Sequence, residues 1–175
     1  MTVNEACALI ITDRIRQDAG ISRWADLGCG EGLFTVALSR MLTEGSIIYG
    51  IDKKSLIKSR VTGNGVKIIA RKLDFVNDDL VLQNLDGILL ANSIHYVKDK
   101  LGFIGKMKLC LKPLAHFLIV EYDIEVPVAV WVPYPLSFLS MTRLFKSAGF
   151  NQIKKLGERS SVYGNRNIYS ALIGK

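Results

Sequence analysis

A glycine-rich turn at residues 24–32, Trp-Ala-Asp-Leu-Gly-Cys-Gly-Glu-Gly, constrains the fold of this chain more than any other stretch. Gly28, Gly30 and Gly32 stand at every second position, between an apolar run at 21–27 and apolar residues that repeat at helical spacing from Leu33. Glycine allows a sharp turn and a close approach of the backbone to a ligand. A dinucleotide-binding turn has the spacing G-x-G-x-x-G, and here the sixth position is leucine. The pattern predicts a strand, a nucleoside-binding turn and a helix.

Strands and helices are expected to alternate along the rest of the chain. A capping box at Thr2 and Glu5 predicts a helix that runs to about residue 19 and ends at Gly20. Further strands are predicted at 46–51, 65–73, 85–91, 115–120, 151–158 and 167–173, and helices at 53–61, 77–84, 99–112 and 137–148. Near-continuous apolar strands are typical of a parallel sheet covered on both faces. The join at 159–166 is too short for a helical crossover, so the last two strands are expected to pair antiparallel. These elements predict a single α/β domain spanning 1–175: a three-layer sandwich around a mostly parallel seven-stranded sheet that ends in an antiparallel hairpin.

The chain of 175 residues carries a net charge of +7, and its basic residues gather at 53–72 and 98–112. Two interpretations stay open: a surface that attracts nucleic acid or another polyanion, or lysines that solvate the outer faces of helices. No apolar run reaches the roughly 18 residues of a membrane span, and the first residues do not resemble a signal peptide. Three cysteines without ligand spacing predict neither a disulfide framework nor a metal site. A cytoplasmic protein is expected.

Polar residues follow four successive predicted strands. Asp26 closes the first strand, Asp52 the second, Asp74 and Phe75 the third, and residues 92–96, Asn-Ser-Ile-His-Tyr, the fourth. Ligands of open α/β sheets bind outside the carboxyl ends of the strands. Asp52 lies 24 residues after Gly28, and one carboxylate can accept hydrogen bonds from both hydroxyls of a ribose.

The pattern D-x-G-x-G-x-G at 26–32 resembles the first motif of the class I S-adenosylmethionine-dependent methyltransferases. The resemblance covers nearly the whole chain, including the Ser-Ala-Gly-Phe sequence at 147–150, and implies the fold of that family. It implies S-adenosylmethionine as cofactor and S-adenosylhomocysteine as product, without a metal. The cofactor-binding residues that it implies are Asp26, Gly28, Cys29, Gly30, Gly32, Asp52, Lys53, Asp74, Phe75 and Asn92.

The resemblance gives five of these positions particular roles: Asp26 at the ammonium, Asp52 at the ribose, Asp74 with Phe75 at the adenine, and Asn92 at the methionine moiety. Three alternatives stay open. The first is that Asp26 only caps the turn, and the second is that Asp52 caps a following helix. The third is that the acidic pair at 78–79 takes the place of Asp74.

The chemistry of methyl transfer places the remaining candidates after the fourth and fifth strands. A general base is needed only when the acceptor arrives protonated, and the catalytic candidates are His95, Tyr96 and Glu121. A packing or positioning role for His95 is the alternative. Substrate contacts are predicted at His95, Tyr122, Trp131 and Tyr134, the last two in an apolar, proline-stiffened segment at 125–135. That segment alternatively covers a dimer contact or packs over the last helix. His116 opens a strand, so it is expected at the opposite edge of the sheet.

The function predicted first is methyl transfer to a small or medium-sized acceptor. An RNA or protein methyltransferase that uses the basic surface, and a noncatalytic cofactor-binding partner subunit, are the alternatives. The absence of an Asn-Pro-Pro-Tyr sequence argues against amino methylation of DNA bases, and the glycine spacing argues against a nicotinamide-dependent oxidoreductase. A small-molecule partner is expected, with nucleic acid and a homodimer left open and no membrane partner.

Overall fold

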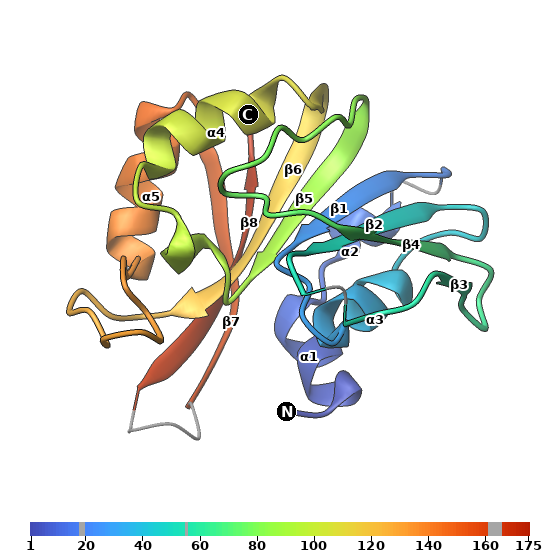
Figure 1. The fold of residues 1–175 in the computed structure, drawn as a ribbon, viewed down its shortest axis with the longest axis horizontal. Coiled ribbons are helices and arrows are strands. Elements are labelled where there is room, and N and C mark those ends of the chain that lie inside the picture. The colour runs from blue at the N-terminus through green and yellow to red at the C-terminus, as the bar shows by residue number, and fades with distance from the viewer. Residues whose placement is uncertain (18–19, 55, 161–165) are drawn as a thin grey trace.

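One mixed sheet organises the protein in a computed structural model that describes residues 1–17, 20–54, 56–160 and 166–175 (Figure 1). Within these residues the strands are β1 (Arg23–Leu27), β2 (Ile47–Asp52), β3 (Arg60–Val61), β4 (Lys67–Lys72), β5 (Leu85–Ala91), β6 (Leu111–Tyr122), β7 (Gln152–Ser160) and β8 (Asn167–Gly174). The helices are α1 (Val3–Ile10), α2 (Asp13–Gln17), α3 (Leu33–Ser39), α4 (Lys100–Lys108) and α5 (Phe138–Ser147), with a 3₁₀ turn, η1 (Ile94–Tyr96). The strand order is β3-β4-β2-β1-β5-β6-β8-β7.

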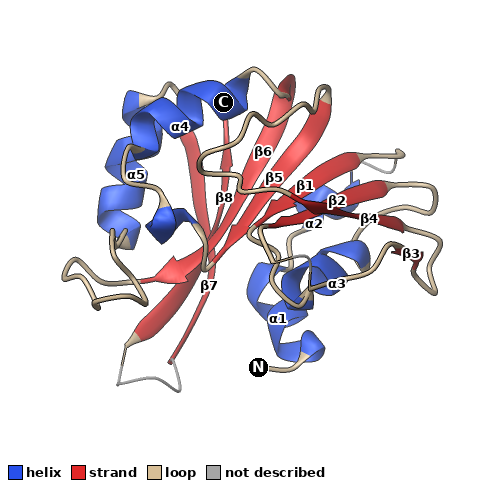
Figure 2. Cartoon of the chain, in the orientation of Figure 1, coloured by secondary structure: helices blue, strands red, loops and turns tan. Residues whose placement is uncertain are grey.

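The pairing of the strands confirms the predicted sheet. The four pairs β4–β2, β2–β1, β1–β5 and β5–β6 are parallel, whereas β8 pairs antiparallel with both β6 and β7. The two-residue β3 pairs antiparallel with β4, and this edge strand was not predicted. Figure 2 shows helices on both sides of the strands, with α1 and α3 on one face and α4 and α5 on the other.

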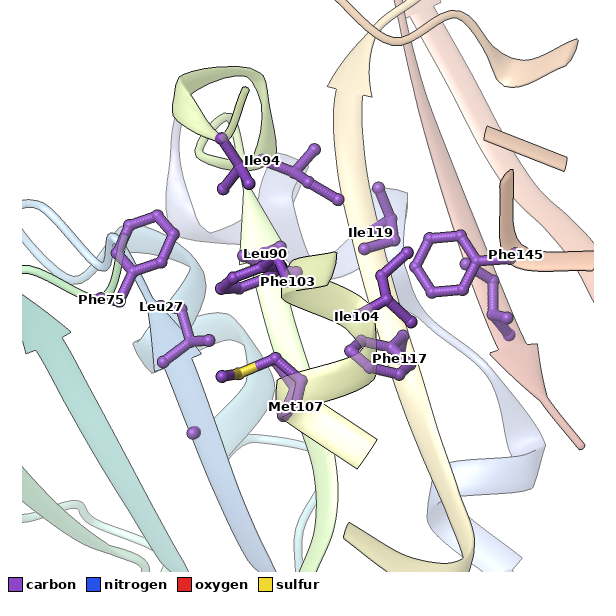
Figure 3. Close-up of a cluster of buried hydrophobic side chains, with 14 of the residues drawn as sticks. Leu27, Phe75, Leu90, Ile94, Phe103, Ile104, Met107, Phe117, Ile119 and Phe145 are labelled. Atoms are coloured by element: carbon purple, nitrogen blue, oxygen red, sulfur yellow. The ribbon is translucent and has the colours of Figure 1, made fainter. Parts of the chain in front are cut away.

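Two buried clusters hold these layers together because successive strand residues point to opposite faces. Trp24 packs with residues of α1 and α3, while its neighbours Ala25 and Leu27 belong to the cluster under α4 and α5. Figure 3 shows part of that second cluster, in which Phe103, Ile104 and Met107 of α4 lie over β1, β5 and β6. Residues from distant parts of the chain therefore fix the strands whose ends carry the predicted site.

The predicted N-terminal helix is wrong in its length. α1 ends at Ile10, Ile11 is extended with φ −62° and ψ 131°, and α2 begins at Asp13. Three β-branched residues in succession, 10–12, lower the helix propensity. The Oγ1 of Thr12 accepts a hydrogen bond from the Arg14 amide at 3.4 Å, which starts the second helix. Residues 18–19 of the predicted helix lie outside the described residues.

The helices predicted at 53–61 and 77–84 are also wrong. Asp52 Oδ1 accepts a hydrogen bond from the Lys54 amide at 2.8 Å, and this turn replaces the first turn of a helix. Asp74 similarly accepts from the Val76 amide at 3.0 Å, and Asn84 takes a left-handed conformation with φ 55°. The described parts of both connections therefore run as turns and extended chain. α4 is shorter than predicted as well, since Leu111 already pairs with Leu85 in the sheet.

Gly87 fixes how closely β1 and β5 approach each other. A methyl group added at Gly87 would lie 2.2–2.5 Å from three ring atoms of Trp24, its buried partner across the two strands. We expect Gly87→Ala to lower the free energy of unfolding by about 1–3 kcal/mol because the buried indole must shift to make room for the methyl group. Urea denaturation measures this loss, and a second substitution, Trp24→Leu, should recover part of it.

Gly105→Ala is the matched control for this substitution. A methyl group at Gly105, in the middle of α4, would meet no atom within 4 Å. We expect this variant to gain about 0.5–1 kcal/mol from the lower backbone entropy of alanine in a helix. Equal effects at the two glycines would contradict the contact with Trp24.

Candidate active site

Two adjoining cavities lie at the carboxyl ends of the parallel strands. We call the first, about 360 Å³, the glycine-turn cavity; its lining residues are Gly28, Gly30, Asp52, Lys53, Lys54, Leu56, Asp74, Phe75, Val76, Asn92, Ser93 and Tyr96. We call the second, about 540 Å³, the tryptophan cavity; its lining residues are Asn92, His95, Tyr96, Tyr122, Val128, Trp131, Val132 and Arg166. Asn92 and Tyr96 belong to both. A ligand in one cavity therefore lies next to a ligand in the other.

A third cavity of about 560 Å³ lies at the opposite edge of the sheet. Its lining includes Ile15 of α2, Trp24 near the start of β1, and His116 of β6. The structure thus places His116 away from the other candidates, as predicted. It does not open its strand, however, because β6 begins at Leu111. None of the predicted site residues lines this cavity.

The glycine turn brings its backbone to the edge of the first cavity. The amides of Gly28 and Cys29 both donate to the Ile51 carbonyl, at 2.8 and 3.1 Å, so the turn is tied to the end of β2. Gly28 has φ +79°, and a methyl group there would lie 2.6 Å from Ser93 Cβ. At Gly30, with φ +52°, a methyl group would meet no protein atom within 4 Å. Gly28 is thus required by packing, whereas Gly30 leaves open space for a ligand.

Asp26 lies behind the glycine turn rather than on the cavity wall. It is 1% exposed, and its Oδ2 accepts a hydrogen bond from the Thr35 hydroxyl of α3 at 2.5 Å. Its Oδ1 is buried without a hydrogen-bond partner among the described residues. Burial raises the pKa of Asp26 from 3.8 to about 7, although the bond from Thr35 opposes the shift. A carboxylate with a buried free oxygen is suited to a cationic ligand group.

The raised pKa of Asp26 predicts a pH dependence of stability. The folded protein keeps a proton that the unfolded chain releases near pH 3.8. The contribution of Asp26 to the free energy of unfolding is therefore largest below that pH and is lost as pH rises through about 7. We expect the free energy of unfolding to fall by about 2 kcal/mol between pH 5 and 7 because of this group. Urea denaturation at several pH values measures the slope.

Asp26→Asn is the control for that slope, because the amide does not titrate. The exposed carboxylates of Glu5 and Glu125 have pKa values lowered by hydrogen bonds from Thr2 and Ser137, so they act below this pH window. An Asp26→Asn variant that shows the same loss between pH 5 and 7 would exclude Asp26 as its source.

Asp52 and Asp74 line the glycine-turn cavity and organise its loops. Asp52 Oδ2 accepts from the Gly30 amide at 3.1 Å, while its Oδ1 holds Lys54. Asp74 accepts from Val76 and from the side chain of Asn77 at 3.0 Å each. No helix follows Asp52 directly, so Asp52 does not cap a helix. Its side chain instead stabilises the turn at 53–54. The exposed pair at 78–79 does not line the cavity, which favours Asp74 over that alternative.

Asn92 and Ser93 point to a ligand where the two cavities meet. Asn92 follows β5 in a left-handed conformation with φ +52°, and its amide donates to Val120 at 2.8 Å. Asn92 Oδ1 and Ser93 Oγ are both buried and have no partner among the described residues. Unpartnered buried oxygens are costly unless a ligand or water satisfies them, and strained backbone is common at binding sites.

His95 lines the tryptophan cavity and forms a buried pair with Glu121, which does not line the cavity. His95 Nδ1 lies 2.9 and 2.8 Å from the two carboxylate oxygens of Glu121, and the side chains are 3% and 0% exposed. η1 carries the histidine, and the adjacent strand β6 carries the glutamate. The carboxylate fixes Nδ1 as the protonated nitrogen, so Nε2 is the basic nitrogen of the ring. This arrangement allows His95 to accept a proton from a molecule in the cavity.

Several predicted residues lie outside both linings. Cys29 and Gly32 belong to the turn but line neither cavity. Glu121 and Tyr134 also lie outside both linings, and the backbone amide of Tyr134 donates to the His95 carbonyl at 3.0 Å. Burial, then the nearby Asp26 and Asp52, raise the pKa of the Cys29 thiol well above its usual range, which argues against a thiolate there. Lys100 donates to the Tyr134 carbonyl at 2.8 Å and holds this segment in place.

The sequence analysis missed other lining residues: Lys54, Leu56, Val76, Ser93, Val128, Val132 and Arg166. Most of them adjoin a predicted residue in the chain, and that proximity was a usable signal. Arg166 was different, because only the pairing of β8 beside β6 brings it to the site. Within the described part of the chain, no group of three or more His, Cys, Asp or Glu side chains is arranged to hold a metal ion.

Comparison with known proteins identifies the family. The model of the methyltransferase domain family matches residues 25–119, more than half of the chain, so the protein belongs to this family. The match includes the end of β1, the glycine turn and the strands β2 to β5, and it ends before Tyr122, Trp131 and Arg166 of the tryptophan cavity. The predicted membership of the class I S-adenosylmethionine-dependent methyltransferases is confirmed. A search of curated protein sequences finds no match.

Solved structures confirm the fold. Magnesium protoporphyrin IX methyltransferase from Synechocystis PCC 6803, with bound S-adenosylmethionine, is 14% identical with a TM-score of 0.64, over 97% of this chain and 77% of that one. A methyltransferase from Aquifex aeolicus is 16% identical with a TM-score of 0.58, over 100% of both chains. Human N-acetylserotonin methyltransferase is 18% identical with a TM-score of 0.66, over 99% of this chain and 52% of that one. The present chain thus spans about half the length of the human protein.

The α-helices of the described residues are between five and ten residues long. None of them is both long enough and apolar enough to cross a membrane.

Proposed function

We propose that this chain transfers the methyl group of S-adenosylmethionine to a small or medium-sized acceptor bound in the tryptophan cavity. The observation that carries the proposal is the junction of the two cavities at Asn92 and Tyr96. Methyl transfer requires donor and acceptor to be held in line and shielded from water, and adjoining cavities provide that alignment. The compared enzymes from Synechocystis and human bear the names of small acceptors, which agrees with the proposal.

The residues of the glycine-turn cavity suit the cofactor chemically. Asp52 would accept the ribose hydroxyls, and Phe75 with Asp74 would hold the adenine. The buried free oxygen of Asn92 would accept from the ammonium group of the methionine moiety, and Asp26, which lies behind the turn, would attract that group by its charge. When bound, the cofactor supplies an activated methyl group on a sulfonium. The protein then needs only to align the acceptor and, where the acceptor is protonated, to remove its proton.

His95 is the general base in this proposal. Its Nε2 accepts the proton of an acceptor hydroxyl or ammonium, and Glu121 stabilises the imidazolium through Nδ1. Tyr96, 46% exposed and shared by the two cavities, contacts both bound molecules. This assignment gives His95 a chemical role and makes Glu121 a positioning residue.

A macromolecular acceptor is a second candidate, and one observation favours it. Between Asp52 and Asp74 lie seven basic residues and no acidic ones. All seven are exposed, and none takes part in an ion pair with another described residue. They are Lys53, Lys54, Lys58, Arg60, Lys67, Arg71 and Lys72. Such a surface beside the cofactor would attract RNA in a salt-dependent manner.

One experiment separates the candidates. The purified protein is incubated with S-adenosylmethionine carrying a labelled methyl group and with the small-molecule, RNA or protein fraction of a cell extract. We expect label to enter the small-molecule fraction and S-adenosylhomocysteine to accumulate with it. Label in RNA or protein would replace the leading candidate by the second. Binding of S-adenosylhomocysteine without transfer to any fraction would support a noncatalytic partner subunit instead.

A further inference from the structure

Resting on the proposed function, we propose that the tryptophan cavity takes a flat, apolar acceptor that carries an anionic group. Arg166 holds the anion, while the atom to be methylated faces His95. Three features of the cavity support this class of acceptor: its positive charge, its apolar wall, and the different exposed fractions of His95 and Arg166.

Arg166 gives the tryptophan cavity a positive charge that is not neutralised by a carboxylate of the described residues. Arg166 is the lining residue with a permanent charge, and no carboxylate of the described residues lies within 4 Å of its guanidinium. The acids close to this region in the fold are engaged elsewhere. Glu158 accepts from the side chain of Asn167 at 2.6 Å and pairs with Lys155. Glu121 is fully buried against His95, and Asp123 accepts from the Phe138 amide at 2.9 Å at the start of α5. A guanidinium on the wall of a cavity that forms no ion pair with the described residues is suited to an anionic ligand group.

The same cavity has an apolar wall. Val128 and Val132 form an isolated β-bridge, with 3.1 Å between each amide and the opposite carbonyl. The turn between them contains Ala129, whose φ is +35°, and presents Trp131 to the cavity. Trp131 is 76% exposed although Val132, next to it, is 4% exposed. A rigid turn that exposes an indole at a cavity provides a stacking surface for a flat ligand.

His95 and Arg166 lie at different depths in the tryptophan cavity. His95 is 3% exposed, whereas Arg166 is exposed, so the base lies inside the cavity and the cation lies at its solvent side. An acceptor that satisfies both would enter with its nucleophilic atom first and leave its charge at the rim. The volume of about 540 Å³ falls within the range of small-molecule sites. A single aromatic ring with a hydroxyl at one end and a carboxylate at the other meets these conditions.

Binding of matched phenols tests this inference. The probes are 4-hydroxyphenylacetate, its uncharged amide, and 4-hydroxybenzylphosphonate, each titrated in the presence of S-adenosylhomocysteine. Trp131 reports on binding by its fluorescence, since Trp24, the other tryptophan, is buried at the opposite edge of the sheet. We expect the carboxylate to bind about tenfold more tightly than the amide. The phosphonate shows whether the site prefers a carboxylate or a phosphate-like anion.

Variants assign the preference to Arg166. Arg166→Gln should bind carboxylate and amide equally, whereas Arg166→Lys should keep part of the difference. Arg143→Gln removes an exposed arginine of α5 that lines neither cavity, and should behave like the unchanged protein. Equal binding of carboxylate and amide, no binding of any probe, or a preference that survives Arg166→Gln would overturn the inference.

A failure of this inference is distinguishable from a failure of the proposed function. Calorimetric titration of S-adenosylhomocysteine reports on the glycine-turn cavity, which Arg166 does not line. If that molecule binds while the phenols show no charge preference, the acceptor class is wrong and the methyltransferase proposal stands. If that molecule does not bind, the proposed function fails, and the phenol titrations repeated without it still test the tryptophan cavity.

Discussion

Asp52→Ala is expected to weaken the binding of S-adenosylhomocysteine by about 100-fold. The reason is that this carboxylate serves two purposes in the glycine-turn cavity. It holds the amides of Gly30 and Lys54, at 3.1 and 2.8 Å, and so joins the glycine turn to the loop after β2. In the proposed complex it also accepts the two ribose hydroxyls, since each oxygen has a second lone pair. Calorimetric titration measures the loss, with NADH as the comparison ligand.

Two further variants show which purpose dominates. Asp79→Ala removes an exposed acid that does not line the cavity, and should bind like the unchanged protein. Asp52→Asn keeps one acceptor oxygen but loses the charge, so an intermediate affinity is expected. If Asp52→Ala bound S-adenosylhomocysteine as tightly as Asp79→Ala, the ribose contact would be wrong. Binding of NADH by the unchanged protein would contradict the choice of cofactor.

The location of the glycine-turn cavity was predictable because parallel strands end at one edge of a sheet. Asp52 and Asp74 follow β2 and β4, and Asn92 follows β5, so identifying the strands was enough to bring them together. The roles of individual atoms were less predictable. Asp26 lies near the end of the first strand, before the glycine turn, as predicted, but its side chain lies behind the turn. There it accepts a hydrogen bond from Thr35 of α3, a contact that depends on tertiary packing and that the sequence did not indicate.

The segments at 53–61 and 77–84 show the opposite case. Each follows an aspartate whose side chain accepts a hydrogen bond from a backbone amide two residues later, and this local bond competes with a helix. The composition of these two segments did not indicate this outcome, because their residues are also found in helices. Arg166 was missed for a different reason. It reaches the tryptophan cavity only because β8 returns antiparallel beside β6, and the register of that pair is set by side-chain packing.

The pair of His95 and Glu121 carries the second large expected effect, and it is measurable before any acceptor is known. Glu121→Leu removes the partner of a buried histidine, and we expect it to lower the free energy of unfolding by about 3–5 kcal/mol. For a chain of this size the melting temperature should fall by about 10 °C. The double variant His95→Phe with Glu121→Leu should recover part of this loss, because an apolar pair leaves no polar group unpaired. Equal stabilities of the single and double variants would show that the contact has no energetic weight.

The same pair decides whether His95 acts as a base once a methyl acceptor is available. His95→Asn should lower kcat by about 100-fold to 10,000-fold and change KM little, since the base acts on the reacting proton rather than on binding. His116→Asn is the matched control, because the chain has two histidines and this one lines the cavities at the far edge of the sheet. The stable double variant adds a sharper test. If it folds and binds S-adenosylhomocysteine but transfers no methyl group, the defect is chemical. If it transfers methyl groups at the normal rate, the buried pair is a structural element and the acceptor arrives already deprotonated.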